Sequence, residues 1–159
     1  MLYLVRHAKA GRRGAFAGDD RARPLTEAGR RQAKLLAKRM APTVKALGVT
    51  TLYSSPFLRC IDTLQPLAKT IGAVVELDDR LAETRSYVPV LDMLWSLPDG
   101  TVLCSHGDVI PETMGALERR GCEFTNHPDW RKASVWVLER STHGEIIRAE
   151  SWPPPDADK

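Results

Sequence analysis

The first eleven residues, Met1-Leu-Tyr-Leu-Val-Arg6-His7-Ala8-Lys9-Ala10-Gly11, decide how the rest of the chain is interpreted. Leu2 to Val5 is a short apolar run of the kind that forms a buried strand, and it ends at two adjacent basic side chains. In open α/β sheets, ligands bind at the edge where the parallel strands end. The stretch therefore predicts a strand that delivers Arg6 and His7 to a ligand-binding edge.

Strand-like and helix-like patterns alternate along the chain. Short apolar runs at 51–54, 74–77 and 101–104 predict three more strands, separated by stretches with a helical period of apolar residues. The segments 134–138 and 146–151 flank a turn and predict an antiparallel hairpin. The fold class expected is α/β, a three-layer sandwich in which helices cover both faces of a mostly parallel sheet that ends in this C-terminal hairpin.

Three local features carry further expectations. Thr26 can cap the helix that follows it, and Pro66 is expected to kink or split the next helix because it lacks a backbone donor. Residues 9–23 have no apolar period and predict a mobile loop. Residues 1–152 are expected to form one domain, with a frayed tail at 153–159.

Composition narrows the class of protein. The 23 basic and 20 acidic residues give a net charge of +3, too balanced to indicate nucleic-acid binding. The three cysteines show no metal-ligand spacing, so they predict reduced thiols in a cytoplasmic protein, with neither disulfides nor a metal site. No basic leader or long apolar run is found, so neither a signal peptide nor a membrane span is expected.

Polar residues follow three of the predicted strands in a similar way. The first strand ends at Arg6-His7, the second leads into a helix that carries Arg59, and the fourth ends at Ser105-His106. Parallel strands bring these ends to one edge. Two arginine forks match phosphoryl oxygens, while one imidazole can attack phosphorus and the other can donate a hydrogen bond. Neither a metal nor an organic cofactor is needed for that chemistry.

Four motifs in this order and spacing resemble the histidine phosphatase superfamily, which has the phosphoglycerate-mutase-like fold. They are Val5-Arg6-His7-Ala8, Arg23-Pro24-Leu25-Thr26-Glu27-Ala28-Gly29-Arg30-Arg31-Gln32-Ala33, Ser54-Ser55-Pro56-Phe57-Leu58-Arg59-Cys60-Ile61-Asp62-Thr63 and Ser105-His106-Gly107. The short chain looks most like the compact branch typified by the phosphohistidine phosphatase SixA. Two segments also resemble the phosphatase half fused to Nudix hydrolases in some mycobacterial nucleotide-sanitising enzymes.

The resemblance implies a role for each matching residue. His7 would be the nucleophile that becomes phosphorylated, Arg6, Arg59 and His106 would hold the phosphoryl group, and Arg23 would be a fourth anion contact. Elementary electrostatics agrees, because a nucleophilic imidazole must be neutral and neighbouring cations lower its pKa.

The general acid is less defined. In larger relatives a Glu follows the third strand, and Glu83 has that location; it is either a proton donor or a solvated turn residue. Asp19, Asp20 and Asp108 are weaker candidates, since an acid near phosphate needs a raised pKa.

Other polar residues have simpler interpretations. Arg12, Arg13 and Arg21 either contact a second anionic group on the substrate or are only solvated. Ser54 and Ser55 are expected to cap a helix rather than act as nucleophiles, and His127 and His143 to be surface histidines.

These observations favour a phosphatase that hydrolyses a phosphomonoester or phosphoramidate through a phosphohistidine intermediate, with a phosphorylated protein favoured over a small phosphorylated metabolite as substrate. The alternatives are a nucleotide phosphate or diphosphate phosphatase, a phosphoglycerate-type mutase, and a non-catalytic phosphate-binding regulator. Mutases of the resembling family carry helical insertions for which this chain has little room, and a non-catalytic protein would be expected to have lost His7 or Arg59.

Overall fold

A single mixed sheet organises the chain. The structure, a computed structural model, describes residues 1–156. Within them the sheet has seven strands in the order β3-β2-β4-β1-β6-β7-β5. Their bounds are β1 (Leu2–Arg6), β2 (Thr51–Ser54), β3 (Val74–Leu77), β4 (Val102–Ser105), β5 (Glu123–Phe124), β6 (Val135–Arg140) and β7 (Ile146–Trp152). The first four strands pair in parallel, whereas β6 runs antiparallel to both β1 and β7.

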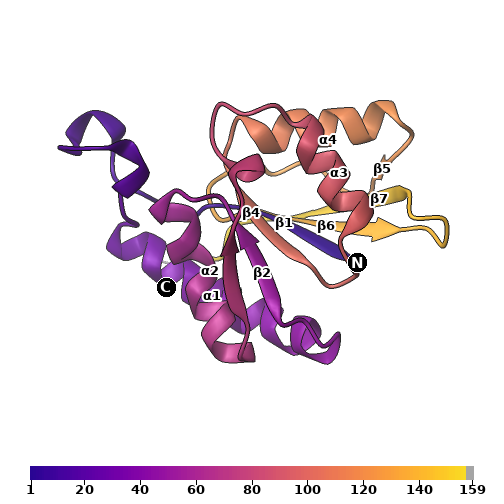
Figure 1. Cartoon of the computed structure of the whole chain (residues 1–159), viewed down its shortest axis with the longest axis horizontal. Helices are drawn as coiled ribbons and strands as arrows, with labels where there is room; N and C mark the ends of the chain where they lie inside the picture. Colours follow the sequence, from indigo (N-terminus) through magenta and orange to yellow (C-terminus); the bar gives the residue numbers. More distant parts are fainter. Residues whose placement is uncertain (157–159) are drawn as a thin grey trace.

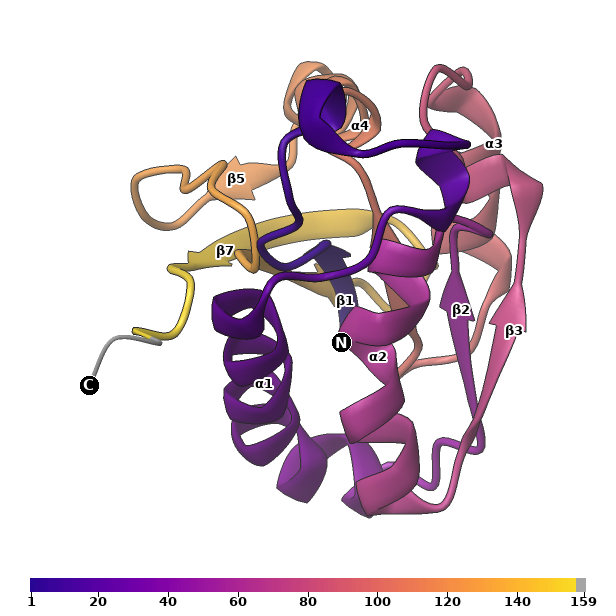
Figure 2. The same ribbon diagram turned by 90° about the vertical axis from the view of Figure 1, so that its left-hand side faces the viewer.

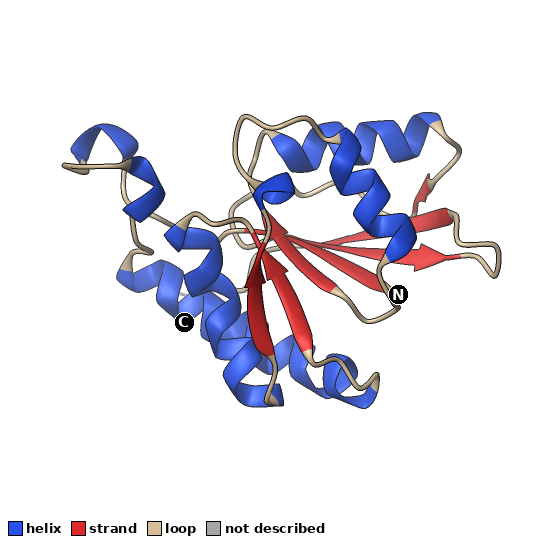
Figure 3. Ribbon diagram, in the orientation of Figure 1, coloured by secondary structure: helices blue, strands red, loops and turns tan. Residues whose placement is uncertain are grey.

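Helices cover both faces of this sheet (Figures 1 and 3). On one face lie α1 (Glu27–Ala46) and α2 (Leu58–Ile71), and on the other lie α3 (Val88–Ser96) and α4 (Val109–Arg119). Strand β1 is buried on both sides: Tyr3 and Val5 pack toward α1 and α2, whereas Leu2 and Leu4 pack toward α3 and α4. The predicted three-layer α/β sandwich with a C-terminal antiparallel hairpin is confirmed.

Pro66 does not split its helix, and the segment after β1 contains local structure that the sequence pattern did not predict. Helix α2 continues through Pro66 from Leu58 to Ile71, so the helix is not split there. The carbonyl that loses its partner is that of Asp62, a half-buried residue that solvent reaches. The segment at 9–23, predicted to be a mobile loop, forms two short 3-10 helices, η1 (Arg13–Ala15) and η2 (Asp20–Ala22), and Ala10 bridges to Leu25. A third, η3 (Asp79–Leu81), follows β3.

The ends of the parallel strands define one edge of the molecule. In Figure 2 the arrowheads of β1, β2 and β3 point toward the edge over which the indigo segment after β1 arches. At the other end of the chain, residues 153–156 have no regular structure, and the rest of the expected tail, 157–159, lies outside the described residues. Within residues 1–156, no helix combines the length and the apolar character required to cross a bilayer.

Candidate active site

Two histidines meet at the carboxyl edge of the sheet. Strands β1 and β4 pair in parallel with Arg6 opposite Ser105, so the next residues, His7 and His106, lie side by side. Their ring centroids are 5.4 Å apart. The His7 amide donates to the carbonyl of Ser105 over 3.1 Å, which continues the pairing one residue past the strand.

The environment of His7 defines its protonation state. The residue is 5% exposed, and its Nδ1 lies 2.8 Å from the carbonyl oxygen of Ala8. Since a carbonyl can only accept, Nδ1 carries the proton and Nε2 keeps a lone pair. Burial is the largest cause that lowers the pKa of His7 from 6.5 to about 3, and the charges of Arg59 and Arg6 add to it, against the opposing bond to Ala8. The ring is therefore a neutral imidazole at physiological pH.

His106 is fully buried and held from both of its nitrogens. Nε2 lies 2.8 Å from Ser55 Oγ, and Nδ1 lies 3.5 Å from an Nη2 of Arg59. Because a guanidinium only donates, Nδ1 accepts and Nε2 donates to the serine. The ring of Phe57 packs edge-on against it at a centroid distance of 4.8 Å.

Ser54 and Ser55 were expected to cap α2, and this expectation was wrong. Helix α2 has Phe57 at its N-cap position, with no side-chain capping bond. Ser54 donates to the carbonyl of Ser55, and Ser55 accepts weakly from the Phe57 amide at 3.3 Å while it orients His106.

Arg59, in the first turn of α2, is fully buried beneath the strand ends. One terminal nitrogen donates to the carbonyl of Asp20 at 3.0 Å. The other lies 3.2 Å from Asp20 Oδ2 and 3.1 Å from Glu83 Oε2. Its guanidinium also lies 4.7 Å above the ring of Phe57. A buried cation is thus neutralised by two carboxylates at the floor of the site.

Arg6 and Gly107 are in close contact. Arg6 donates to the carbonyl of Trp130, and its Nε is buried without a partner among the described residues. A Cβ on Gly107 would lie 2.5 Å from the Arg6 guanidinium carbon, so a larger residue at this position would push the guanidinium out of its place. Burial lowers the pKa of Arg6, while nearby Asp108 raises it. The glycine of the Ser105-His106-Gly107 motif therefore makes room for this guanidinium.

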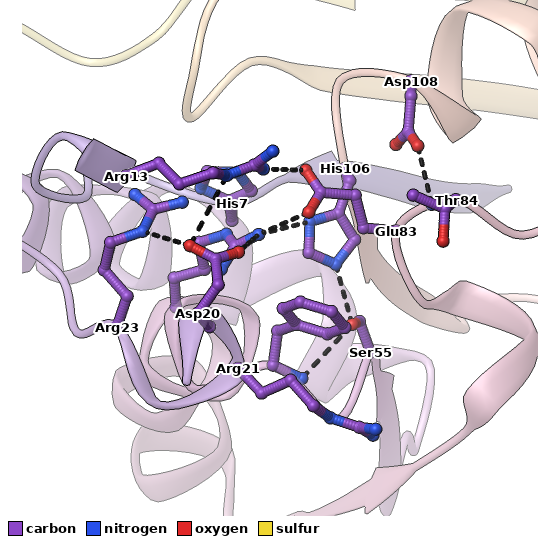
Figure 4. A network of polar contacts seen from close by, with 12 residues as sticks. His7, Arg13, Asp20, Arg21, Arg23, Ser55, Glu83, Thr84, His106 and Asp108 are labelled. Atoms are coloured by element: carbon purple, nitrogen blue, oxygen red, sulfur yellow. Dashed lines mark hydrogen bonds and ion pairs between the residues drawn. The ribbon is translucent and has the colours of Figure 1, made fainter. Parts of the chain in front are cut away.

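Arg23 reaches the same place from the loop before α1. It is 5% exposed, donates through Nε to Asp20 Oδ1 at 2.8 Å, and donates through Nη1 to the carbonyl of Gly11. Burial raises the pKa of Asp20, but the hydrogen bond from Arg23 and the charges of Arg59, Arg23 and Arg13 outweigh it and hold that pKa below its ordinary value. Figure 4 shows Asp20 at the centre of this network.

Glu83 has both carboxylate oxygens in ion pairs. Oε1 lies 2.7 Å from Arg13 Nη2, and Oε2 lies 3.1 Å from Arg59 Nη2. Among the weaker acid candidates, Asp108 caps α4 and accepts from the Thr84 amide at 2.8 Å, and Asp19 accepts from the Arg21 amide. The structure therefore places Glu83 in the arginine cluster, paired with cations.

A cavity of about 540 Å³ opens above these groups. Five of the residues that line it are basic, two are acidic and one is His7; the lining is Arg6, His7, Ala10, Gly11, Arg12, Arg13, Arg23, Glu83, Gly107, Asp108 and Lys132. Arg59 and His106 are fully buried and are not part of this lining. Within residues 1–156, no three His, Cys, Asp or Glu side chains gather as a metal ion would require.

Sequence reasoning missed three contributors to the site: Ser55 as the partner of His106, Asp20 as the bridge between arginines, and Lys132 in the cavity wall. Burial and the charges of Arg6, Arg23, Arg59 and Arg13 lower the pKa of Lys132. The next residue, Ala133, has φ of 68° and donates its amide to the carbonyls of Arg6 and His7, which ties this segment to β1. No periodic pattern at 125–133 could have indicated that contact.

Comparison with known proteins identifies the family. Residues 2–89 match the model of the histidine phosphatase superfamily, branch 1. The chain is 35% identical to an 8-oxo-(d)GTP phosphatase of Mycolicibacterium smegmatis over 98% of its length, and 41% identical to a protein of Cronobacter sakazakii described as a phosphoglycerate mutase, GpmB, over 96%. It spans 48% of the first relative and 64% of the second.

The fold has a counterpart among solved structures. A structure from Nakamurella multipartitia described as a phosphohistidine phosphatase SixA superimposes with a TM-score of 0.73 at 24% identity, over 98% of this chain and 96% of that one. The match to the family model covers more than half of the chain. The superimposed structure shares the fold in which the four motifs of the sequence lie. The chain belongs to the histidine phosphatase superfamily, branch 1.

Proposed function

We propose that the chain is a phosphatase in which His7 takes the phosphoryl group from a phosphomonoester or phosphoramidate and water then releases phosphate. The observation that carries this proposal is the state of His7: a buried, neutral ring whose Nδ1 proton is held by Ala8, with Nε2 left as nucleophile beside His106. We take residues 1–152 as the unit that carries the activity.

The cations around His7 bind the phosphoryl oxygens in this scheme. Nε2 forms a bond to phosphorus as the bond to the leaving group breaks, and the leaving group departs with the electron pair. Arg6, Arg23 and Arg59 stabilise the charge on the oxygens during transfer, whereas the one ring proton of His106 is held by Ser55 Oγ in the free protein. Water then attacks the phosphohistidine, which restores neutral His7 and frees phosphate. No cofactor or metal enters this scheme.

Glu83 could either position Arg59 or donate a proton to the leaving group. Its ion pairs with Arg13 and Arg59 favour a carboxylate that positions Arg59 over a protonated acid that feeds the leaving group. We therefore assign Glu83 to positioning.

A phosphorylated protein side chain is the substrate that we favour. The cavity is open above His7, and the fold is shared with a structure described as a phosphohistidine phosphatase. A protein substrate bearing phosphohistidine would suit a site without a free general acid.

A nucleotide phosphate is the second candidate. Arg12 and Lys132 line the cavity, and neither forms an ion pair with a described carboxylate, so they are available to a second anionic group. The 35% identical relative is an 8-oxo-(d)GTP phosphatase. Against a mutase, the open cavity gives water access to the phosphohistidine.

Turnover of an aryl phosphate tests the catalytic proposal. We expect His7→Asn to lower kcat by about 10³-fold or more, because the nucleophile is removed. His143→Asn, a matched change at an exposed histidine, is expected to leave the rate unchanged. Comparable rates for wild type and His7→Asn, or no turnover by the wild type, would contradict the proposal. The rates of turnover of a phosphohistidine protein, nucleoside mono- and diphosphates and phosphoglycerate are then compared to identify the preferred substrate.

A further inference from the structure

The carboxylate of Asp20 lies on three guanidinium groups at once. Oδ1 is 2.8 Å from Arg23 Nε and 3.5 Å from Arg13 Nε, and Oδ2 is 3.2 Å from Arg59 Nη2. The backbone carbonyl of the same residue accepts from Arg59 Nη1 at 3.0 Å. Figure 4 shows these contacts converging on Asp20 beside His7.

Two of these guanidinium groups are the ones assigned above to the phosphoryl oxygens. Arg23 and Arg59 are both almost fully buried, so neither can turn to solvent to find another partner. The two oxygens of Asp20 span them as two oxygens of a phosphoryl group would. Glu83 also contacts Arg59 but makes no bond to Arg23, so Asp20 alone among the described residues bridges the pair.

We propose that Asp20 sets the charge selectivity of the pocket: its carboxylate occupies the phosphoryl position between Arg23 and Arg59, and only a dianionic phosphoryl group displaces it. This inference rests on the proposed function, because it takes Arg23 and Arg59 as phosphoryl contacts. It assigns to Asp20 the discrimination between phosphomonoesters, which are dianions, and phosphodiesters, which are monoanions.

The selectivity follows from charge and tethering. A monoanion that replaces Asp20 exchanges one negative charge for another and also competes with a group that the chain holds in place at high effective concentration. A dianion brings an additional charge to the arginine cluster and gains net attraction. The low pKa of Asp20 keeps it ionised near neutral pH, so protonation does not remove the competitor. Its side chain is 27% exposed in the short helix η2, so it can rotate toward solvent when displaced.

Equilibrium binding measures this selectivity without requiring turnover. Inorganic phosphate, a dianion at about pH 8, and dimethyl phosphate, a monoanion, are titrated calorimetrically into the full chain and its variants. We expect Asp20→Asn to bind phosphate about tenfold more tightly than wild type and to bind dimethyl phosphate measurably where wild type does not. Asp19→Asn is the matched control, because it removes the same charge from the same loop but contacts only the Arg21 amide. It is expected to match wild type.

Each other outcome counts against the proposal. Weaker phosphate binding by Asp20→Asn would show that Asp20 organises the arginines, and equal changes in Asp19→Asn would show a general charge effect. Asp20→Ser provides a second variant, with thermal unfolding to show that both are folded, and it must change selectivity in the same direction. A wild type that binds no phosphate would contradict the proposed function itself, whereas phosphate binding with unchanged selectivity in both Asp20 variants would contradict only this inference.

Discussion

The protonation state of His7 is a property of its immediate neighbours. The carbonyl of Ala8 selects the tautomer, and the Ala8 amide is itself held by Thr63 Oγ1 of α2 at 2.9 Å. Burial removes the water that would stabilise an imidazolium, and the cations beside the ring repel it. One strand end and one helix therefore prepare a nucleophile without a dedicated base.

This environment predicts how stability depends on pH. The folded-state pKa of His7, about 3, is below the ordinary 6.5, so the unfolded chain binds its proton first as the pH falls. The contribution of His7 to stability is complete above about pH 6.5 and is lost as the pH falls toward about 3. Between about pH 7 and 4.5 we expect wild type to lose roughly 2–3 kcal/mol more than His7→Asn.

Urea unfolding of both proteins at the two pH values provides the measurement. The carboxylates that titrate in this range are common to both proteins, so the difference between them isolates His7. Parallel losses of stability in wild type and His7→Asn would mean that the folded protein accepts a proton on His7 without cost.

Some site residues could be predicted from the sequence and others could not. Arg6, His7 and His106 follow strand ends, and a parallel sheet brings such ends together whatever the side-chain packing. The contacts of Asp20, Ser55 and Lys132 depend instead on how loops fold over that edge, and loop geometry has no periodic signal in the sequence.

The strands and helices also divide into those that the sequence predicts and those that it does not. Strands and helices with a clear apolar period were predicted at their positions, because burial against the sheet enforces that period. Strand β5 was missed, since Glu123 and Phe124 are too few to show alternation. The 3-10 helices η1 and η2 were missed because ion pairs, rather than apolar packing, hold the segment at 9–23.

Helix α1 positions the residues after His7 through its first turn. The Lys9 carbonyl accepts from the Thr26 amide at 2.9 Å, and the Lys9 amide donates to Gln32 Oε1 at 3.1 Å. A Cβ on Gly29 would lie 1.9 Å from the Lys9 carbonyl oxygen, a backbone atom that cannot move aside alone. The backbones of α1 and of the segment after β1 are therefore so close at Gly29 that no side chain fits between them.

Substitution of Gly29 tests this packing. We expect Gly29→Ala to lower the free energy of unfolding by about 3 kcal/mol, because the helix must separate from the loop. Gly115→Ala in α4 is the control: its nearest neighbour is the flexible tip of Arg119 at 3.3 Å, and alanine is favoured there by roughly 1 kcal/mol. Chemical denaturation gives the free energy of unfolding of wild type and both variants. A Gly29→Ala protein as stable as wild type would mean that α1 does not hold this segment.

At the scale of the whole molecule, one sheet edge collects groups from four distant parts of the chain. The residues that follow β1 and β4 provide the two histidines, α2 provides Arg59, and the segment before α1 provides Arg23. The central claim is that this assembly transfers a phosphoryl group to His7. It predicts an acid-labile phosphoenzyme with its modification on one imidazole.

Rapid quenching during turnover of an aryl phosphate, followed by peptide mapping by mass spectrometry at alkaline pH, tests that claim directly. We expect phosphate on His7 in the wild type and on no residue of His7→Asn. Phosphate found on another side chain, or undiminished turnover by His7→Asn, would contradict it.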